Sequence, residues 1–237
     1  MVNEWISFNQ SRFLPQHCEL CGGRSDLNAL ICDGCLKDLP ILSAACEQCG
    51  IQLDEHQDSK LCGACQSDPP SFALTRCLFT YQYPVDRLVQ RFKFGEQLIL
   101  ARLFGELMGR SMRAYYAESE YFPQGLLPVP LHPNRLRERG FNQAFELAKF
   151  CKMTSGIPIL DNCCVRVKDT SHQPGLSRAA RRTNLRGAFK ITSTHVPKRI
   201  ALIDDVLTTG TTCETLSQAL IKAGVESVHL WCIARAV

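Results

Sequence analysis

The hydrophobic and polar positions of residues 72–237 follow two alternating periods. Apolar runs of strand length occupy residues 72–83, 126–130, 157–160, 163–167, 200–203 and 228–233. Apolar residues at helical spacing fill the intervals, from residue 84 to 108 and over residues 141–152 and 213–223. The Asp161-Asn162 turn leaves open whether 157–167 is one element or two. Strands that alternate with helices predict an α/β domain, a parallel sheet with helices on both faces.

The first 70 residues lack this pattern and hold eight of the 14 cysteines, in four CxxC pairs. Ten residues separate the first two pairs and twelve separate the last two. Each CxxC turn directs two thiolates at one point, and two turns complete a tetrahedron, so the spacing predicts two structural zinc sites. Sequential pairing is the expected arrangement, and interleaved pairing is the alternative. The ligands are Cys18, Cys21, Cys32, Cys35, Cys46, Cys49, Cys62 and Cys65.

The turn signal Asp68-Pro69-Pro70-Ser71 predicts a boundary between two domains. Residues 1–70 would form a double zinc ribbon and residues 71–237 the α/β domain. The ribbon segment holds four Lys and Arg against ten Asp and Glu, which suits a scaffold or protein-binding role better than contact with a phosphate backbone. The six other cysteines lie in mostly apolar surroundings and are expected to be buried and inert.

The most informative segment is IALIDDVLTTGTT at residues 200–212. A buried strand over 200–203 is followed by two acids, a loop of small hydroxylated residues and a helix that begins near Thr212. This order surrounds a phosphate-sized space with backbone N–H groups and a helix N-terminus, while the two carboxylates reach the hydroxyls of a ribose. The predicted site residues are Asp204, Asp205, Val206, Leu207, Thr208, Thr209, Gly210, Thr211 and Thr212.

A second informative region is basic. Residues 131–190 hold twelve Lys and Arg against four Asp and Glu. Its basic residues gather in two loops that follow predicted strands, and ligands of such sheets bind beyond the carboxyl ends of the strands. A solvated basic surface is the alternative, but this placement favours an anion larger than one phosphate.

These motifs together resemble a known family. IDDVLTTGTT at 203–212 is similar to the motif with which type I phosphoribosyltransferases bind 5-phosphoribosyl 1-pyrophosphate (PRPP). With the four CxxC pairs and VPLHPNRLRERGFNQA at 129–144, the chain resembles the ComF/GntX family of competence-associated proteins. The resemblance extends to KFGEQLILARLFGELM at 93–108 and RRTNLRGAF at 181–189. It implies a phosphoribosyltransferase fold behind the ribbons, a setting in DNA uptake, and binding of single-stranded DNA.

The resemblance also implies roles for individual residues. Asp204 and Asp205 would hold the ribose hydroxyls, and residues 206–212 the 5′-phosphate. Residues 131–139 would form the pyrophosphate loop, and residues 168–186 a loop that closes over PRPP. Mg²⁺ would arrive with PRPP. The anion-binding residues would be Leu131, His132, Arg135, Arg137, Arg139, Arg178, Arg181 and Arg182.

Two functions follow from these expectations. In the first, the protein binds PRPP, holds single-stranded DNA on the basic 131–190 segment, and contacts other DNA-uptake proteins through its ribbons. In the alternative, it is a Mg²⁺-dependent phosphoribosyltransferase, with Asp204 and Asp205 catalytic, that transfers phosphoribosyl to a nitrogen acceptor and releases pyrophosphate. Thr208 stands where 6-oxopurine phosphoribosyltransferases have an acid, which argues against purine salvage.

The chain has no apolar run of membrane-spanning length and no secretory signal pattern at its N-terminus. The expected location is therefore the cytoplasm, without membrane insertion.

Overall fold

The computed structural model of the chain describes residues 17–26, 29–54, 58–93, 97–117, 119, 121–169 and 184–236. The chain forms two compact units, Met1–Pro40 and Ile41–Val237. The first unit contains the short helix α2 (Asp33–Lys37) and the first two CxxC pairs. The second unit contains the other two pairs, helix α3 (Gly63–Ser67), and all of the sheet.

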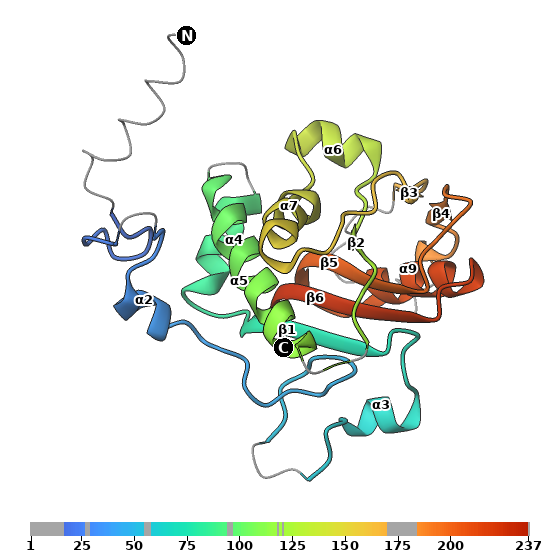
Figure 1. The fold of residues 1–237 in the computed structure, drawn as a ribbon, viewed down its shortest axis with the longest axis horizontal. Coiled ribbons are helices and arrows are strands. Elements are labelled where there is room, and N and C mark those ends of the chain that lie inside the picture. The colour runs from blue at the N-terminus through green and yellow to red at the C-terminus, as the bar shows by residue number, and fades with distance from the viewer. Residues whose placement is uncertain are drawn as a thin grey trace. The chain divides into compact units, whose positions relative to one another are not determined.

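A four-stranded sheet forms the centre of the second unit. Its strands are β1 (Leu74–Thr80), β2 (Gly125–Pro128), β5 (Arg199–Leu207) and β6 (Ser227–Arg235). They pair in parallel in the order β1-β6-β5-β2 (Figure 1). Strand β6 is buried along its length up to Arg235, as expected for a parallel strand covered on both faces. The predicted parallel α/β architecture is confirmed.

Helices connect the strands and cover the sheet (Figure 1). Helices α5 and α7 pack together and contact β6, β5 and β2, whereas α9 contacts β6 and the β4 strand. Strands β3 and β4 form a small antiparallel sheet, and β4 contacts α9. The bounds are α4 (Val85–Lys93), α5 (Ile99–Tyr116), α6 (Pro133–Arg139), α7 (Gln143–Ser155), α9 (Thr211–Lys222), β3 (Cys164–Arg166) and β4 (Phe189–Ile191).

The contact between α5 and α7 is close because a glycine faces it. A Cβ atom on Gly105 would lie 2.7 Å from the carbonyl oxygen of Leu147 and 2.7 Å from Cβ of Phe150. Any larger side chain would push the helices apart. The two helices therefore pack as a close pair, which contacts the sheet that carries the candidate site.

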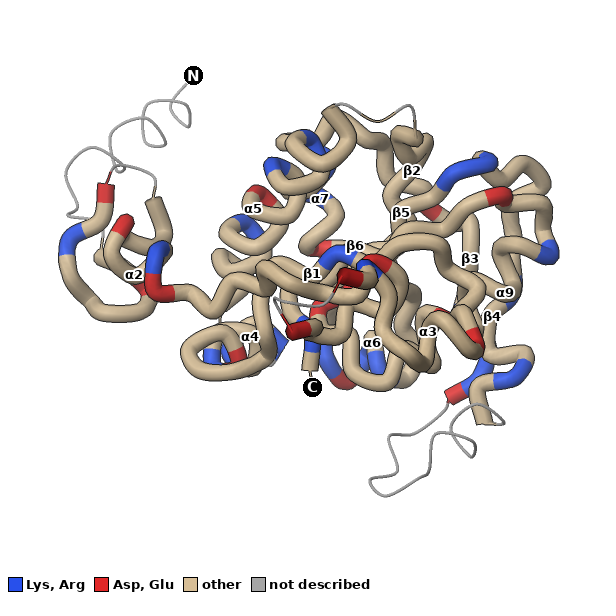
Figure 2. Tube along the Cα trace, turned by 90° about the horizontal axis from the view of Figure 1, so that it is seen from below, with Lys and Arg blue, Asp and Glu red and all other residues tan. Residues whose placement is uncertain are grey.

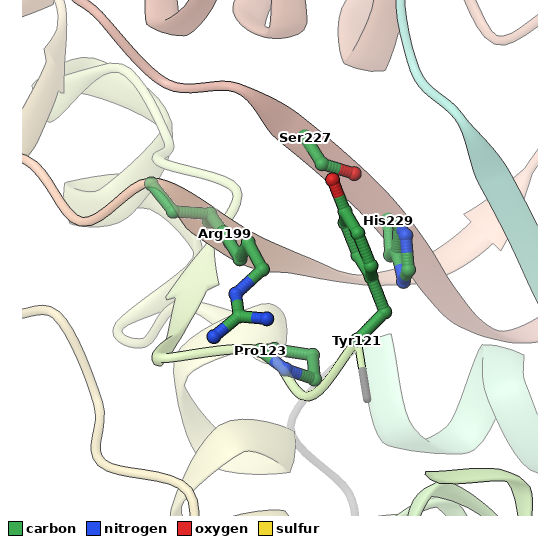
Figure 3. Close-up of a pocket in the computed structure, with 6 residues that line it drawn as sticks. Tyr121, Pro123, Arg199, Ser227 and His229 are labelled. Atoms are coloured by element: carbon green, nitrogen blue, oxygen red, sulfur yellow. The ribbon is translucent and has the colours of Figure 1, made fainter. Parts of the chain in front are cut away.

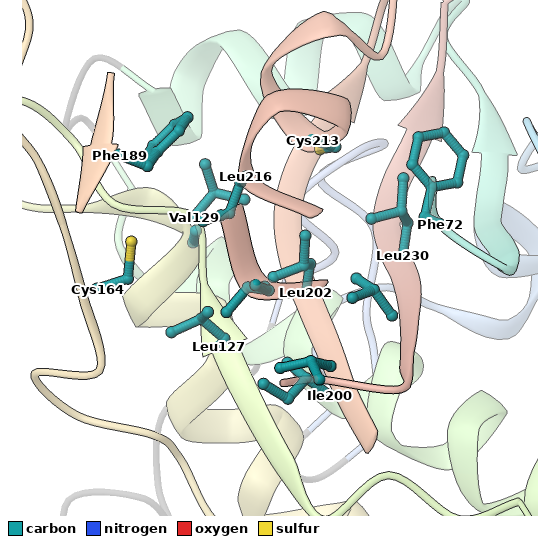
Figure 4. Packing of buried hydrophobic residues seen from close by; sticks show 14 of the residues in the cluster. Phe72, Leu127, Val129, Cys164, Phe189, Ile200, Leu202, Cys213, Leu216 and Leu230 are labelled. Carbon is teal, nitrogen blue, oxygen red and sulfur yellow. The ribbon is translucent and has the colours of Figure 1, made fainter. Parts of the chain in front are cut away.

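The hydrophobic core fills the space between the sheet and α9 (Figure 4). Leu202 of β5 and Leu230 of β6 pack there with Leu216 of α9, and all three are fully buried. The six cysteines outside the CxxC pairs are also buried, as predicted: Cys77, Cys151, Cys163, Cys164, Cys213 and Cys232.

Three segments differ from the sequence-based expectation. The strand predicted over 200–203 continues through both acids to Leu207, because Val206 and Leu207 still pair with β6. The predicted turn 131–139 contains helix α6, which begins where His132 Nδ1 accepts a hydrogen bond from the Asn134 amide. Of residues 157–160, only Ile159 bridges to β2.

None of the helices in the described ranges is both long enough and apolar enough to cross a membrane.

Candidate phosphate site and zinc centres

Two adjacent carboxylates lie near the carboxyl end of β5. Asp205 is buried, and its Oδ2 lies 3.1 Å from Nζ of Lys93, the last residue of α4. Its Oδ1 accepts a hydrogen bond from the Val206 amide at 2.6 Å. Asp204 Oδ1 accepts from the Asp205 amide at 2.9 Å, and its Oδ2 lies 3.9 Å from the Cys213 thiol, which donates to it. The sheet therefore holds both acids in fixed positions.

The position of Asp204 changes its acidity. Burial raises the pKa of Asp204 to about 7, and the negative charge of Asp205 adds to this rise. The Asp205 amide, Lys93 and Arg166 act in the opposite direction but do not cancel it. Near neutral pH the acid pair is thus partly protonated, and a ligand that needs both carboxylates ionised must displace a proton.

The loop that follows β5 is built to receive an anion. Gly210 precedes α9 with φ of +73°, a left-handed conformation that glycine adopts without a steric penalty. The Thr209 and Thr211 hydroxyls lie 2.9 Å apart. Helix α9 adds the positive end of its dipole. Within the described parts of the chain, four amides here have no protein acceptor, those of Thr208, Thr209, Gly210 and Thr212.

The segment after β2 lies next to these acids. The Val129 amide donates to the carbonyl of Ile203 at 2.9 Å, which extends the pairing of β2 with β5 to the edge of the sheet. Asn142 closes the segment by donating to the Val129 carbonyl at 3.1 Å. Leu131 and His132 therefore follow β2 at the same edge as Asp204 and Asp205.

The arginines of α6 are partly engaged within their own segment. Arg137 donates to the Asn134 side chain at 3.0 Å, and Arg139 donates to Gln143 at 3.1 Å. Arg135 is partly exposed. Arg178, Arg181 and Arg182 fall outside the described residues, so their role as anion-binding residues stays a prediction.

The sequence reasoning missed two basic residues at this site. Lys93 reaches Asp205 from the last turn of α4. Arg166 of β3 interacts electrostatically with Asp204. Burial and the charge of Arg135 lower the pKa of Arg166, and the charges of Asp169 and Asp204 act in the opposite direction. Neither residue belongs to a recognisable spacing pattern. The available signals were weaker: Lys93 opens the motif at 93–108, and Arg166 is one of the twelve basic residues of 131–190.

A separate pocket lies at the opposite edge of the sheet (Figure 3). Arg199 and Ser227 line it at the amino ends of β5 and β6, together with Tyr121 and His229. The Arg199 guanidinium lies 5.4 Å from the centre of the Tyr121 ring. Because β5 rises by about 3.3 Å per residue, roughly 20 Å of strand separates this pocket from Asp205. It is not part of the phosphate site.

The cysteines of the first unit form one metal-binding cluster. The sulfur atoms of Cys18, Cys21, Cys32 and Cys35 all lie within 4.8 Å of one another. The amides of Leu20 and Gly23 donate to sulfur at 3.4 Å. Burial opposes ionisation of Cys18, but backbone N–H groups of Cys21, Cys32 and Leu20 outweigh it and lower the pKa to about 6. Four thiols with such donors fit a structural zinc ion.

The cysteines of the second unit form an equivalent cluster. Cys46, Cys49, Cys62 and Cys65 bring their sulfur atoms within 4.8 Å of one another. The Cys62 amide donates to the sulfur of Cys46 at 3.3 Å. Sequential pairing of the CxxC turns is thus confirmed, and both four-cysteine sites fit zinc.

Comparisons with known proteins agree with this picture. A model of the double zinc ribbon domain matches residues 10–70. The chain is 37% identical over 230 residues to competence protein F of Haemophilus influenzae, which covers 94% of this chain and 99% of that protein. It is 30% identical over 224 residues to DNA utilization protein YhgH of Salmonella typhimurium, covering 94% and 98%. It is 28% identical over 160 residues to competence protein ComFC of Streptococcus pneumoniae, covering 68% and 67%.

The two clusters predict a zinc content that substitution should change in steps. The purified chain should hold about two zinc ions, and Cys21→Ser or Cys49→Ser should each leave about one, because an incomplete ligand set binds zinc weakly. Elemental analysis by mass spectrometry measures this content. Cys151→Ser, outside both clusters, should retain two. Loss of both ions in each single variant would contradict two independent sites.

The raised pKa of Asp204 predicts how stability depends on pH. The pKa is about 7 in the folded chain and near 3.8 without perturbation, so the folded chain binds an extra proton between these values. Stability contributed by this group therefore falls as pH rises from about 4 to about 7. Asp204→Asn should raise the thermal midpoint by about 3 °C at pH 8 and by much less at pH 4.

Calorimetric unfolding at the two pH values checks this expectation. Glu226→Gln, an exposed substitution at the other edge of the sheet, should show no such pH-dependent difference. An effect of Asp204→Asn that is equal at pH 4 and pH 8 would show that the carboxyl group is not perturbed.

Proposed function

The chain belongs to the ComF family of competence proteins, and we propose that it binds PRPP at the β5–α9 loop and serves in the uptake and use of external DNA. Relatives named competence protein F and DNA utilization protein support the biological setting. The geometry of the acid pair and the loop supports the ligand.

One observation carries the PRPP proposal. Four loop amides without an acceptor among the described residues lie between the end of β5 and the first turn of α9, shortly after the two acids of that strand, of which Asp205 is buried and Asp204 partly buried. The amides suit a 5′-phosphate, and the carboxylates suit the vicinal hydroxyls of its ribose. Only Val206 and Leu207 separate the acid pair from the first of the loop amides. This short separation in sequence suits one sugar phosphate better than two separate ligands.

The segment after β2 supports a ligand that carries a pyrophosphate in addition to the 5′-phosphate. His132 and Arg135 follow β2 at the same edge of the sheet, where a pyrophosphate on the ribose would reach them. Arg166 adds a partly buried positive charge on the side of β3. Mg²⁺ bound with PRPP would neutralise part of the pyrophosphate charge, while Lys93 balances Asp205 in the free protein.

Single-stranded DNA is the second proposed ligand. Figure 2 shows Lys and Arg positions interspersed with Asp and Glu positions along much of the chain, and α6 itself contains Arg135, Arg137 and Arg139. Arg135 and Arg137 of α6, with Lys152 of α7, are at least partly exposed. Such groups hold a phosphate backbone without reading its sequence.

The acid pair provides the test of PRPP binding. Asp204→Asn and Asp205→Asn should each weaken the binding of PRPP with Mg²⁺ by about tenfold or more, because each substitution removes a charged acceptor of the ribose hydroxyls. Isothermal calorimetry at pH 8 measures the affinities. Glu226→Gln should bind as the parent does. Equal PRPP affinity in the parent and in both acid variants would refute the assignment of the site.

The basic residues provide the test of DNA binding. Affinity for a labelled single-stranded oligonucleotide should fall linearly with the logarithm of salt concentration, with a slope of about −0.7 per phosphate contact. Arg137→Gln should make this slope shallower by about 0.7 in a fluorescence titration. Arg110→Gln, an equally exposed change on α5, is the control and should leave it unchanged. An affinity that does not depend on salt would exclude a basic DNA surface.

A further inference from the structure

Arg235, the last residue of β6, joins two parts of the second unit. Its Nε donates to the carbonyl oxygen of Cys49 at 3.1 Å. Its Nη1 donates to the carbonyl oxygen of Leu207 at 3.0 Å and also to those of Thr208 and Ala236. Cys49 is a ligand of the second zinc cluster, and Thr208 begins the loop after β5. One partly buried guanidinium thus connects the metal centre to the phosphate loop.

These contacts fix the direction of two amides in the loop. A trans peptide is planar, and its C=O and N–H bonds point in opposite directions. Arg235 holds the carbonyls of Leu207 and Thr208, so the N–H groups of the next residues, Thr208 and Thr209, are turned away from it. Both of these N–H groups are among the amides without a protein acceptor in the described chain. The arginine therefore aims phosphate donors without touching the ligand.

A second contact links the ribbon to the start of α9. The amide and hydroxyl of Ser71 each donate to the Glu214 carboxylate at 2.8 Å. Glu214 lies in the first turn of α9. Gln48 of the ribbon donates to the carbonyls of Pro70 and Phe72, on either side of Ser71. The start of the phosphate loop is thus linked to the ribbon through Arg235. The helix that follows the loop is linked through Glu214 to Ser71, just after the ribbon.

The ribbon depends on its metal for this geometry. Among the described residues of 41–70, the buried ones are Cys46, Gly50 and Cys65, so the segment has almost no apolar core of its own. Small domains of this kind are ordered by the metal that they bind. The Cys46–Cys49 turn, which places the Cys49 carbonyl, is closed by the Gly50 amide, which donates to the Cys46 carbonyl at 2.8 Å, and zinc bound to the four sulfur atoms would close it further.

We propose that Arg235 couples the second zinc site to the phosphate loop, so that zinc and the 5′-phosphate of PRPP bind cooperatively. This inference rests on the proposed PRPP site and adds its regulation. Arg235 is a positioning residue, since its Nε and Nη1 donate to backbone carbonyls. By thermodynamic reciprocity, zinc must raise the affinity for PRPP by the same factor by which PRPP raises the affinity for zinc.

The test uses the full chain with Cys21→Ser, in which the second site holds the remaining zinc. Zinc transfer to a coloured chelator is timed with and without PRPP and Mg²⁺. PRPP should slow the transfer at least about fivefold in this parent, and less than twofold after Arg235→Gln is added. The matched control is Arg76→Gln, which removes another arginine that approaches the ribbon, 4.0 Å from Glu47. It should keep the fivefold effect.

A merely structural role for Arg235 would speed zinc release equally with and without PRPP, and the ratio of the two rates would stay at its parent value. That result would overturn the coupling. The same holds if Arg76→Gln abolishes the effect as fully as Arg235→Gln does.

A second readout does not depend on PRPP. Removal of zinc should shift the amide NMR signals of Thr208 and Thr209 in the parent, whereas in the Arg235→Gln variant these signals should not respond to zinc. Unmoved signals in the parent would overturn the inference. If the signals move but PRPP does not bind, the proposed ligand fails while the link between zinc and the loop stands.

Discussion

The parallel pairing of β5 with strands on both of its sides is the constraint on which the rest of the structure depends. It buries the strand up to its end, and it directs β2, β5 and β6 to finish at one edge of the sheet. The groups of the candidate phosphate site all lie at that edge: the acids, the loop before α9, and the segment that leads into α6. Because the strand continues through Asp204 and Asp205, the first carboxylate is partly and the second almost fully removed from water, and burial raises the pKa of Asp204 to about 7.

The two zinc clusters have the same chemistry but different structural surroundings. The first belongs to a compact unit of its own, whereas the second shares a unit with the sheet. Thr75 of β1 donates through its amide to the Glu47 carbonyl and through its hydroxyl to the Gln48 carbonyl. The second ribbon, whose four cysteines fit a zinc ion, is therefore bonded to β1, the edge strand next to β6.

Much of the fold could be predicted from the sequence because its signals are local. Apolar runs marked β1, β2, β3, β5 and β6 but not the short β4, and the CxxC spacing marked both clusters. The exact end of β5 could not be predicted, because two adjacent acids look like a strand terminus when only neighbours in sequence are considered. Pairing with β6 carries the strand past them. Lys93 and Arg166 were missed for a similar reason: Lys93 contacts Asp205, and Arg166 acts electrostatically on Asp204, across segments far apart in the chain.

The sequence by itself determined which groups this protein possesses: eight paired cysteines, an apolar run followed by two acids, a small hydroxylated loop, and a basic segment. These are properties of residue type and short spacing, and they survive without tertiary structure. Only the tertiary structure decided how the groups act on one another. The partner of Asp205, the acidity of Asp204 and the contact of Arg235 with both Cys49 and the loop depend on atoms brought together from segments far apart in the chain, which no local pattern encodes.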